Sequence, residues 1–211
     1  MKAELTRLGD ALLAGNVEEV RRLTQEALRL GVPPQAILDT GMRPAMERLG
    51  ERFSAGLAYL PELLLAADTM KEGMEVLRPA VLRGEVRPEA TLLIGTVEGD
   101  IHDIGKNLVR MMFEGGGFRV IDLGIDVTCE GFVEAYRREQ PDLVGLSALL
   151  TTTIGQMEKV IRLIRAEDPR ARVLVGGAPV RQAFADRIGA SGYAPDAAAA
   201  VKVGRSLLGL G

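Results

Sequence analysis

The hydrophobic pattern of this chain changes period once, between residues 83 and 90, and this change constrains the fold more than any other feature. Before it, apolar residues recur at helical spacing, as in the stripe formed by Leu5, Leu8 and Leu12. After it, apolar residues come in short uninterrupted runs that alternate with segments of helical length. Apolar runs of strand length that alternate with helices predict a parallel sheet with both faces covered. We therefore expect two unlike domains joined by the polar linker 83–90.

The first domain, residues 1–82, is expected to be a four-helix bundle. Asn16 begins the second helix and has a glutamate three positions later, as in a capping box. Gly41 and Pro44 are expected to break or kink the third helix, and Pro61 begins the fourth. The short loops favour an antiparallel arrangement. The core of the bundle is expected to include the methionines at positions 42, 46, 70 and 74.

The second domain, residues 91–211, is expected to be a Rossmann-like α/β domain, doubly wound in the manner of flavodoxin around a five-stranded parallel sheet. Strands are predicted at 91–97, 118–124, 142–149, 171–177 and 191–194. Helices are predicted to begin near Ile104, Cys129, Thr153, Pro179 and Asp196. Histidine, carboxylates, hydroxyls and glycines follow the strands, at 98–105, 124–128, 150–153 and 177–180. Because ligands of such sheets bind beyond the carboxyl ends of the strands, these segments should converge on one binding edge.

Composition argues against several classes of function. A net charge of -3, with 4% aromatic residues and no tryptophan, disfavours nucleic-acid binding. The single cysteine, Cys129, excludes an intrachain disulfide framework and a cysteine-rich metal site. No apolar run approaches the roughly 18 residues of a membrane span, and the N-terminal segment lacks the apolar run of a signal peptide. We expect a cytoplasmic protein with neither nucleic acid nor membrane as a partner.

The only histidine of the chain, His102, follows the first predicted strand. Asp100 is close enough in sequence to orient one ring nitrogen, and Gly105 lets a bulky group approach the next helix. His102 is either a loop histidine without a special role, a general base, or a metal ligand supported by the carboxylate. The chain cannot supply enough histidine or cysteine for a zinc or iron site, and it has no strained serine nucleophile. One imidazole can be the whole protein contribution to a metal site only if the metal brings its other ligands, as in a tetrapyrrole or a corrin.

Three motifs of the second domain together resemble those of cobalamin-binding domains. Residues 100–105 match the D-x-H-x-x-G signature, residues 147–149 match S-x-L, and Gly176-Gly177 match the double glycine. Each motif stands at the end of a predicted strand. Residues 41–74 are also similar to the helical cap module of methionine synthase and of methyl-carrier corrinoid proteins. The resemblance therefore covers nearly the whole chain and identifies residues 1–82 as a cap.

The resemblance implies a base-off/His-on corrinoid, in which His102 replaces the nucleotide base of the cofactor as the lower axial ligand to cobalt. Asp100 is then expected to bond the other ring nitrogen, and the hydroxyl of Thr153 to be the next member of that relay. The relay could couple proton uptake to the release of the histidine. His102, Asp100 and Thr153 are the catalytic candidates, and His102 is the expected metal ligand.

The resemblance also implies a path for the displaced nucleotide tail. The tail should run beside Gly105, Ser147 and Gly176-Gly177, with the hydroxyls of Ser147 and Thr151 bonding its polar atoms. Simpler interpretations remain for these residues, because a double glycine can be a tight turn and the hydroxyls can cap a helix. The remaining motif residues complete the expected cofactor contacts: Ile101, Asp103, Ile104 and Leu149.

Phe53 and Leu60 match the apolar residues that cover the upper face of the corrin in this family, although both positions are equally consistent with the core of a bundle. The cap has to move aside before a partner can reach cobalt. The linker 83–90 is therefore a predicted hinge.

The implied function is that of a corrinoid protein that carries a methyl group on cobalt, as methyl-cobalamin when loaded, between two methyltransferases. The donor is methanol, a methylamine or a methoxylated aromatic compound, and the acceptor is a folate or a thiol. A reductive activator is the third expected partner, so the chain would be one component of a methyltransferase system rather than a complete enzyme. The alternatives are a cobalamin-dependent sensor or regulator, the cobalamin subunit of a mutase, and a flavodoxin-like domain without a corrinoid. The sequence leaves open the donor, the acceptor, the lower base and the oligomeric state.

Overall fold

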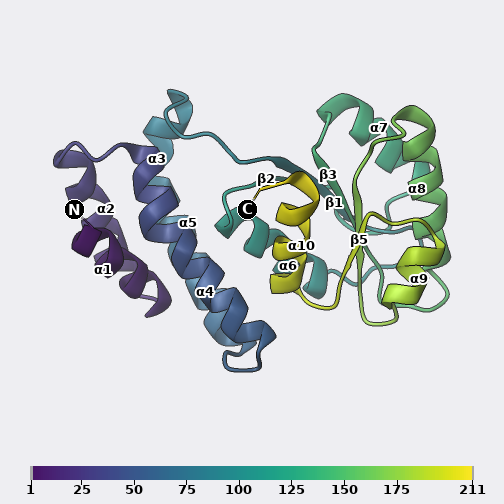
Figure 1. The fold of residues 1–211 in the computed structure, drawn as a ribbon, viewed down its shortest axis with the longest axis horizontal. Helices are drawn as coiled ribbons and strands as arrows, with labels where there is room; N and C mark the ends of the chain where they lie inside the picture. The colour runs from purple at the N-terminus through teal and green to yellow at the C-terminus, as the bar shows by residue number, and fades with distance from the viewer. Residues whose placement is uncertain (1, 211) are drawn as a thin grey trace. The chain divides into compact units, whose positions relative to one another are not determined.

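The computed structural model describes residues 2–210, which form two compact units (Figure 1). The first unit is helical and comprises the chain up to Glu89 together with Gly115–Gly117. The second is an α/β unit formed by Ala90–Glu114 and by the chain from Phe118 onward. All strands of the described chain belong to the second unit.

The helical unit is built from amphipathic helices that each bury one stripe. Its elements are α1 (Lys2–Leu13), α2 (Val17–Arg29), α3 (Pro34–Ala36), the π-helical η1 (Ile37–Met42), α4 (Arg43–Ser54) and α5 (Leu60–Leu82). Asn16 caps α2 as expected, because its side chain accepts the Glu19 N–H at 3.1 Å. Three of the four methionines, at positions 42, 46 and 70, are buried, whereas Met74 is only partly buried.

The third predicted helix is not broken at Gly41 and Pro44. The chain stays helical from Pro34 to Ser54 and widens to a π-helix at Ile37–Met42, where the Arg43 N–H donates to Leu38 O, five residues earlier. Pro44 lies in the first turn of α4, where its missing N–H leaves the smallest gap in the helical bonding. The π-helix shifts the hydrogen-bond ladder by one residue just before the turn that contains the proline.

The α/β unit confirms the predicted doubly wound sheet. Its strands are β1 (Thr91–Thr96), β2 (Arg119–Asp122), β3 (Leu143–Ser147), β4 (Val173–Gly176) and β5 (Gly192–Ala194), and its helices are α6 (Ile104–Gly115), α7 (Cys129–Glu139), α8 (Gly155–Glu167), α9 (Gln182–Arg187) and α10 (Ala197–Leu208). All pairs are parallel, in the order β2-β1-β3-β4-β5. This order is that of flavodoxin-like domains.

Helices cover both faces of this sheet, which explains why its central strands are almost wholly apolar. In Figure 1, α7 and α8 lie on one face, and α6 and α10 lie on the other. Phe132 of α7 is fully buried in the first layer. In the second layer, a Cβ on Gly204 of α10 would lie 2.8 Å from the ring of Phe113 on α6. Only glycine at this position lets the two helices approach so closely.

The polar segment after α5 is held against the rest of the helical unit. Val86 is 6% exposed. The Arg87 N–H donates to Oε1 of Gln35 at 2.9 Å. The buried guanidinium of Arg43 pairs with the carboxylate of Glu89. The segment up to Glu89 is therefore ordered by specific contacts.

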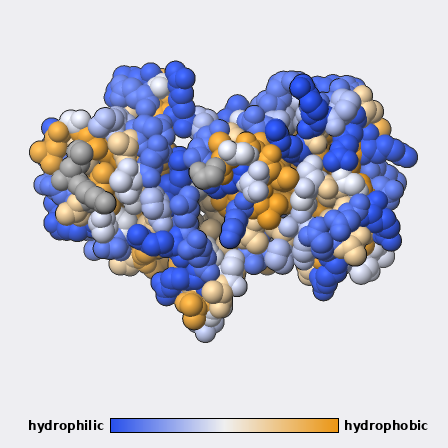
Figure 2. Space-filling model, in the orientation of Figure 1, coloured by the Kyte–Doolittle hydropathy of each residue, from blue (hydrophilic) through white to orange (hydrophobic). Residues whose placement is uncertain are grey.

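The exposed surface of the helical unit is mainly hydrophilic, with one apolar turn between α4 and α5. Leu57 and Tyr59 are 68% and 71% exposed there, and Leu60 is 38% exposed. Figure 2 shows apolar side chains gathered at this end of the unit. None of the helices described here has the length and the apolar character needed to span a membrane.

Candidate functional site

The candidate site lies at the carboxyl edge of the sheet, between its two central strands. The chain leaves β1 toward α6 and β2 on one side, and leaves β3 toward α8 and β4 on the other. The loops that follow β1 and β3 therefore diverge and leave a crevice between them, which is where doubly wound sheets bind ligands. Residues 97–103 form the first of these loops and 148–154 the second.

His102 is oriented by Asp100 within the first loop. Its Nδ1 lies 2.7 Å from Asp100 Oδ1, and its backbone N–H donates to the same oxygen at 3.1 Å. The Asp100 side chain is fully buried, whereas 46% of the His102 side chain is exposed. An ionised carboxylate can only accept hydrogen bonds, so Nδ1 carries a proton, and in the neutral ring Nε2 is the nitrogen with the free lone pair. The geometry presents one imidazole nitrogen as a ligand or base at an open surface.

The second oxygen of Asp100 binds the loop that follows β3. Oδ2 accepts the backbone N–H of Leu149 at 2.7 Å and that of Leu150 at 3.1 Å. Thr153 Oγ1 lies 3.0 Å from the same oxygen and also 3.0 Å from Leu150 O, so its single proton has two alternative acceptors. One carboxylate thus joins the histidine to the second loop, with Thr153 behind it.

Burial by itself would raise the pKa of Asp100. The N–H groups of Leu149, Leu150 and His102, together with the His102 ring, outweigh that effect and hold the pKa of this carboxyl well below its usual range. Asp100 is therefore ionised throughout the physiological range. A permanent negative charge behind the ring makes Nε2 a better electron donor.

Two anchors of this loop were missed by sequence reasoning. Thr96, the fully buried last residue of β1, donates its hydroxyl to His102 O at 3.0 Å. Lys106, 2% exposed in the first turn of α6, places Nζ 2.6 Å from Asp122 Oδ2 at the end of β2. No signal in the sequence distinguished these two residues from ordinary strand-end and helix residues, because their roles depend on which loops meet.

Large apolar side chains at the same edge of the sheet as the imidazole are not buried. They come from the loops after β1, β2 and β3: Ile101 (70% exposed), Ile104 (77%), Ile125 (43%), Leu149 (45%) and Leu150 (39%). Folding alone does not explain such exposure at one edge, and contiguous exposed apolar surface marks a binding site. Ile101, Ile104 and Leu149 were predicted, whereas Ile125 and Leu150 were not. We call these five residues the apolar collar.

The residues predicted along the nucleotide tail lie at the same edge but differ in their surroundings. A Cβ on Gly105 would meet nothing within 4 Å, so open space adjoins the start of α6. Ser147 is the partly exposed last residue of β3, and Thr151 is exposed in the loop after it. Gly176 ends β4. Gly177 has a φ of 131°, and a Cβ there would lie 1.8 Å from Ala148 O, so this glycine is required by a tight turn.

The other sequence candidates are divided between the site loops and the helical unit. Asp103 accepts a bond from Asn107 Nδ2 at 2.9 Å and so stabilises the start of α6. Phe53 is half-buried on α4, and Leu60 is the partly exposed first residue of α5. Both belong to the helical unit and adjoin its apolar turn. Thr153 precedes α8 by two residues, and its hydroxyl is directed to Asp100 rather than to the N–H groups of the helix.

The donor set fits a metal that carries most of its own ligands. Among residues 2–210, no three His, Cys, Asp or Glu side chains come together as a metal site. The edge offers instead one oriented imidazole, an apolar collar and open space beside Gly105. A macrocycle with a central metal needs one axial ligand and an apolar surface beneath it, and these residues provide both.

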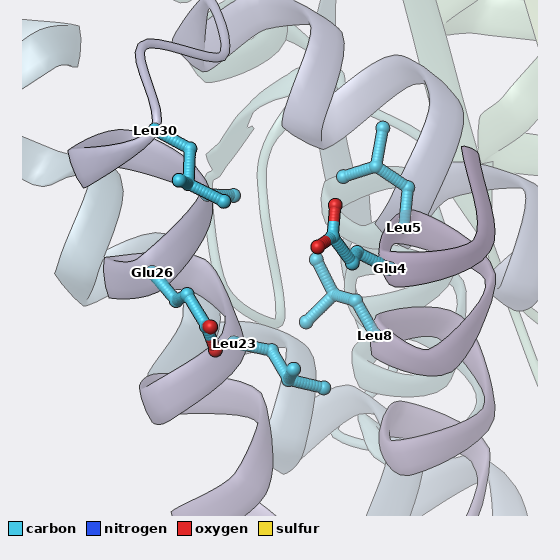
Figure 3. Close-up of a pocket in the computed structure, with 7 residues that line it drawn as sticks. Glu4, Leu5, Leu8, Leu23, Glu26 and Leu30 are labelled. Atoms are coloured by element: carbon cyan, nitrogen blue, oxygen red, sulfur yellow. The ribbon is translucent and has the colours of Figure 1, made fainter. Parts of the chain in front are cut away.

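A separate crevice lies between α1 and α2 of the helical unit (Figure 3). Leu23 and Glu26 of α2, with Leu30 directly after it, face Glu4, Leu5 and Leu8 of α1 across it. Its lining has no imidazole, thiol or hydroxyl, and Leu5, Leu8 and Leu23 are buried core residues. The crevice is a packing feature of the bundle and carries none of the chemistry described above.

Both units match known families. The family described as B12 binding domain matches residues 90–202, and a second B12 binding domain family matches residues 4–78. A dimethylamine corrinoid protein of Methanosarcina acetivorans is 39% identical over 206 residues, which are 97% of this chain and 96% of that protein.

Two solved structures match this chain over nearly its full length. A chain of the methanol:cobalamin methyltransferase complex of Methanosarcina barkeri is similar with a TM-score of 0.86 and 28% identity, over 98% of this chain and 80% of that one. A cobalamin-binding protein of Desulfitobacterium hafniense gives a TM-score of 0.81 and 30% identity, over 96% of this chain and 98% of that one. With one B12-binding family on each unit and relatives that match end to end, this chain belongs to the family of B12-binding corrinoid proteins.

Proposed function

We propose that this protein carries a methyl group on a corrinoid between two methyltransferases. The observation that carries the proposal is the exposed imidazole of His102, held at Nδ1 by a buried carboxylate at the edge of the sheet that also carries the apolar collar. When bound, the corrinoid supplies a cobalt centre that accepts a methyl group from a donor and passes it to an acceptor. The protein supplies the ligand, the orientation and the apolar surroundings.

His102 would hold the cobalt of the corrinoid through Nε2, the nitrogen left free by Asp100. Asp100 fixes both the tautomer and the direction of the ring, and Thr153 supports the other oxygen of that carboxylate. Ligands oriented in this way bind a metal more tightly and more reproducibly than a freely rotating side chain. Gly105 and Ser147 would border the nucleotide tail of the cofactor, for which the open space beside Gly105 leaves room.

Phe53 and Leu60 of the helical unit cover the opposite face of the cofactor in this proposal. Their half-buried state leaves apolar surface available for such a contact. The cap of residues 1–82 would then open and close over the reactive face of the cofactor, with the linker 83–90 as its hinge. Because the segment is ordered up to Glu89 and Gly115–Gly117 also belongs to the helical unit, we place the moving parts of the chain at Glu89–Ala90 and at the two ends of that turn.

A methylamine is the donor that we propose. The full-length match at 39% identity to a dimethylamine corrinoid protein supports this choice over methanol, whose complex matches at 28%. The partners are accordingly a methylamine-specific methyltransferase, an acceptor methyltransferase for a folate or a thiol, and a reductive activator.

Reconstitution tests the cofactor part of the proposal. The purified protein is incubated with hydroxocobalamin, passed through a desalting column and examined by ultraviolet-visible absorption. Retained corrin absorbance with a His-on spectrum is expected, and His102→Gln should lose the His-on features. A protein that retains no corrin would contradict the proposal.

A donor screen tests the substrate part. The methylated product is followed after mixing the reconstituted protein with methyltransferases for monomethylamine, dimethylamine, trimethylamine or methanol. Turnover with the methanol enzyme alone would exclude a methylamine donor but would leave the role of methyl carrier intact.

A further inference from the structure

Only two described residues other than glycine adopt a left-handed backbone, Asp126 with a φ of 52° and Gln140 with a φ of 47°. Gln140 ends α7, where left-handed residues are common. Asp126 lies between β2 and α7, where no helix end accounts for its conformation. Left-handed non-glycine residues are uncommon and are kept where surrounding contacts hold them.

The contacts of Asp126 all go to the loop that carries His102. Its side chain accepts the Gly99 N–H at Oδ1, at 2.7 Å, and its own backbone N–H donates to Asp100 O at 3.0 Å. The next residue continues the connection, because the Val127 N–H donates to Thr96 O at 3.0 Å. Asp126 thus holds the N–H of Gly99 and the carbonyl of Asp100 in the turn that precedes the histidine.

The loop has little freedom to place Asp100 in another way. Gly99 has a φ of 81°, and a Cβ on it would lie 3.4 Å from the methyl group of Thr153. Asp100 itself is fully buried and must meet His102 on one side and the β3 loop on the other. A short bond from a charged acceptor to the Gly99 N–H fixes this turn more firmly than a neutral bond would.

We propose that Asp126 is a positioning residue for the corrinoid ligand. It anchors the peptide groups of Gly99 and Asp100, and through them it sets the direction of the His102 ring. This inference rests on the proposed function for its consequence, because the orientation matters only if His102 binds the cofactor. The anchoring itself is a property of the protein without cofactor.

Three substitutions separate the side-chain bond from the backbone conformation. Asp126→Asn keeps an acceptor oxygen and tolerates the left-handed region. Asp126→Ala loses the acceptor and strains the backbone, whereas Asp126→Gly loses the acceptor and relaxes it. Gln140→Ala is the matched control, since Gln140 is also left-handed and also loses one bond from its side chain to the backbone, Nε2 to Arg137 O at 2.9 Å.

Amide hydrogen exchange of the cofactor-free protein is the first measurement. Exchange at Gly99 should accelerate about tenfold in the Ala and Gly variants, the effect of losing one bond to a charged group, and stay near wild type in Asp126→Asn. The Gln140→Ala control should leave Gly99 unchanged. Equal protection of Gly99 in all variants, or an Asn variant that behaves like Ala, would overturn the assignment.

Titration with hydroxocobalamin is the second measurement, with the His-on absorption spectrum as its readout. We expect the Ala and Gly variants to bind about tenfold more weakly, with a smaller His-on fraction, and the Asn variant to recover both. Wild-type affinity and spectrum in Asp126→Gly would refute the positioning role. If the wild-type protein takes up no corrinoid, the proposed function fails, while the exchange measurement still decides whether Asp126 anchors the loop.

Discussion

Replacing Asp100 by asparagine reverses the hydrogen-bond polarity behind His102 while changing almost no volume. The wild-type carboxylate accepts at both oxygens, from His102 at Oδ1 and from the N–H groups of Leu149 and Leu150 at Oδ2. An amide has one accepting atom and one donating group. We expect the amide oxygen to remain with the two backbone N–H groups, which leaves its NH₂ facing the imidazole. Nδ1 must then accept, and the ring proton moves to Nε2, the nitrogen required for ligation.

The expected losses of folding stability and of cofactor affinity follow from the bonds that this substitution removes. The part-buried backbone N–H of His102 loses its acceptor, and leaving a fully buried donor unsatisfied would cost about 1–3 kcal/mol of folding stability, which sets an upper range here. Removing the carboxylate that orients a metal-bound histidine typically weakens metal affinity by about 10–100-fold. For Asp100→Asn we therefore expect a cofactor-free protein that is folded but less stable, and a loss of hydroxocobalamin affinity in that range.

The assay combines urea denaturation, hydroxocobalamin titration and nitrogen NMR of the imidazole. His102 is the only histidine of the sequence, so the spectrum contains one pair of ring signals and reports the tautomer directly. Asp142→Asn is the control, because Asp142 Oδ2 accepts the Thr91 N–H at 2.8 Å near the amino ends of the strands. An Asp100→Asn protein that keeps its proton on Nδ1 and binds like the wild type would refute the role assigned to this carboxylate.

Three further predictions concern other parts of the chain. Gly105→Ala should leave folding stability equal or raise it by about 0.5–1 kcal/mol, since a helix favours alanine and no atom lies near the new Cβ; cofactor titration should nevertheless show weaker binding. Burial, together with the bond to Asp168, raises the pKa of Tyr136 to about 12. The unfolded phenol ionises near pH 10, so the stabilisation is complete below that pH and is lost as the pH rises toward 12. Urea denaturation between pH 8 and pH 11 should show this fall in the wild type and not in Tyr136→Phe; parallel curves would contradict it. If Phe53 and Leu60 cover the cofactor as proposed, they leave no room for an adenosyl group, so methyl-cobalamin should outcompete adenosyl-cobalamin in a binding competition. Phe53→Ala should narrow this difference in affinity; equal binding by the wild type would argue against the covering role.

The fold could be predicted from the sequence because the apolar residues that indicate it recur at regular spacing. Five apolar runs at strand spacing predict the sheet, and a missed boundary of one or two residues changes nothing in its order. The π-helix at Ile37–Met42 could not be predicted from the sequence, because Pro44 indicates only that one normal helical hydrogen bond is missing. Whether the chain breaks, kinks or shifts its ladder is decided by packing around it.

The residues of the candidate site also fall into those that the sequence predicts and those that it does not. His102 and Asp100 are neighbours in sequence, so their bond could be expected from local reasoning. Thr153 lies 53 positions from Asp100, and its proximity was expected only through a family resemblance. Thr96 and Asp126 had neither signal, because a threonine at a strand end and an aspartate in a loop have many possible partners. Their partners are defined only when the loops are placed in space.

The short turn Gly115–Gly117 belongs with the helical unit, although the chain on both sides of it belongs to the α/β unit. The Glu89 N–H donates to Gly117 O at 2.9 Å and fastens this turn to the end of the helical segment. The two units are therefore interleaved along the chain, and one cut cannot separate them. A chimera that exchanges the helical unit between two corrinoid proteins has to include both the chain up to Glu89 and the turn Gly115–Gly117. Otherwise the turn of one parent will pack against a helical unit from the other.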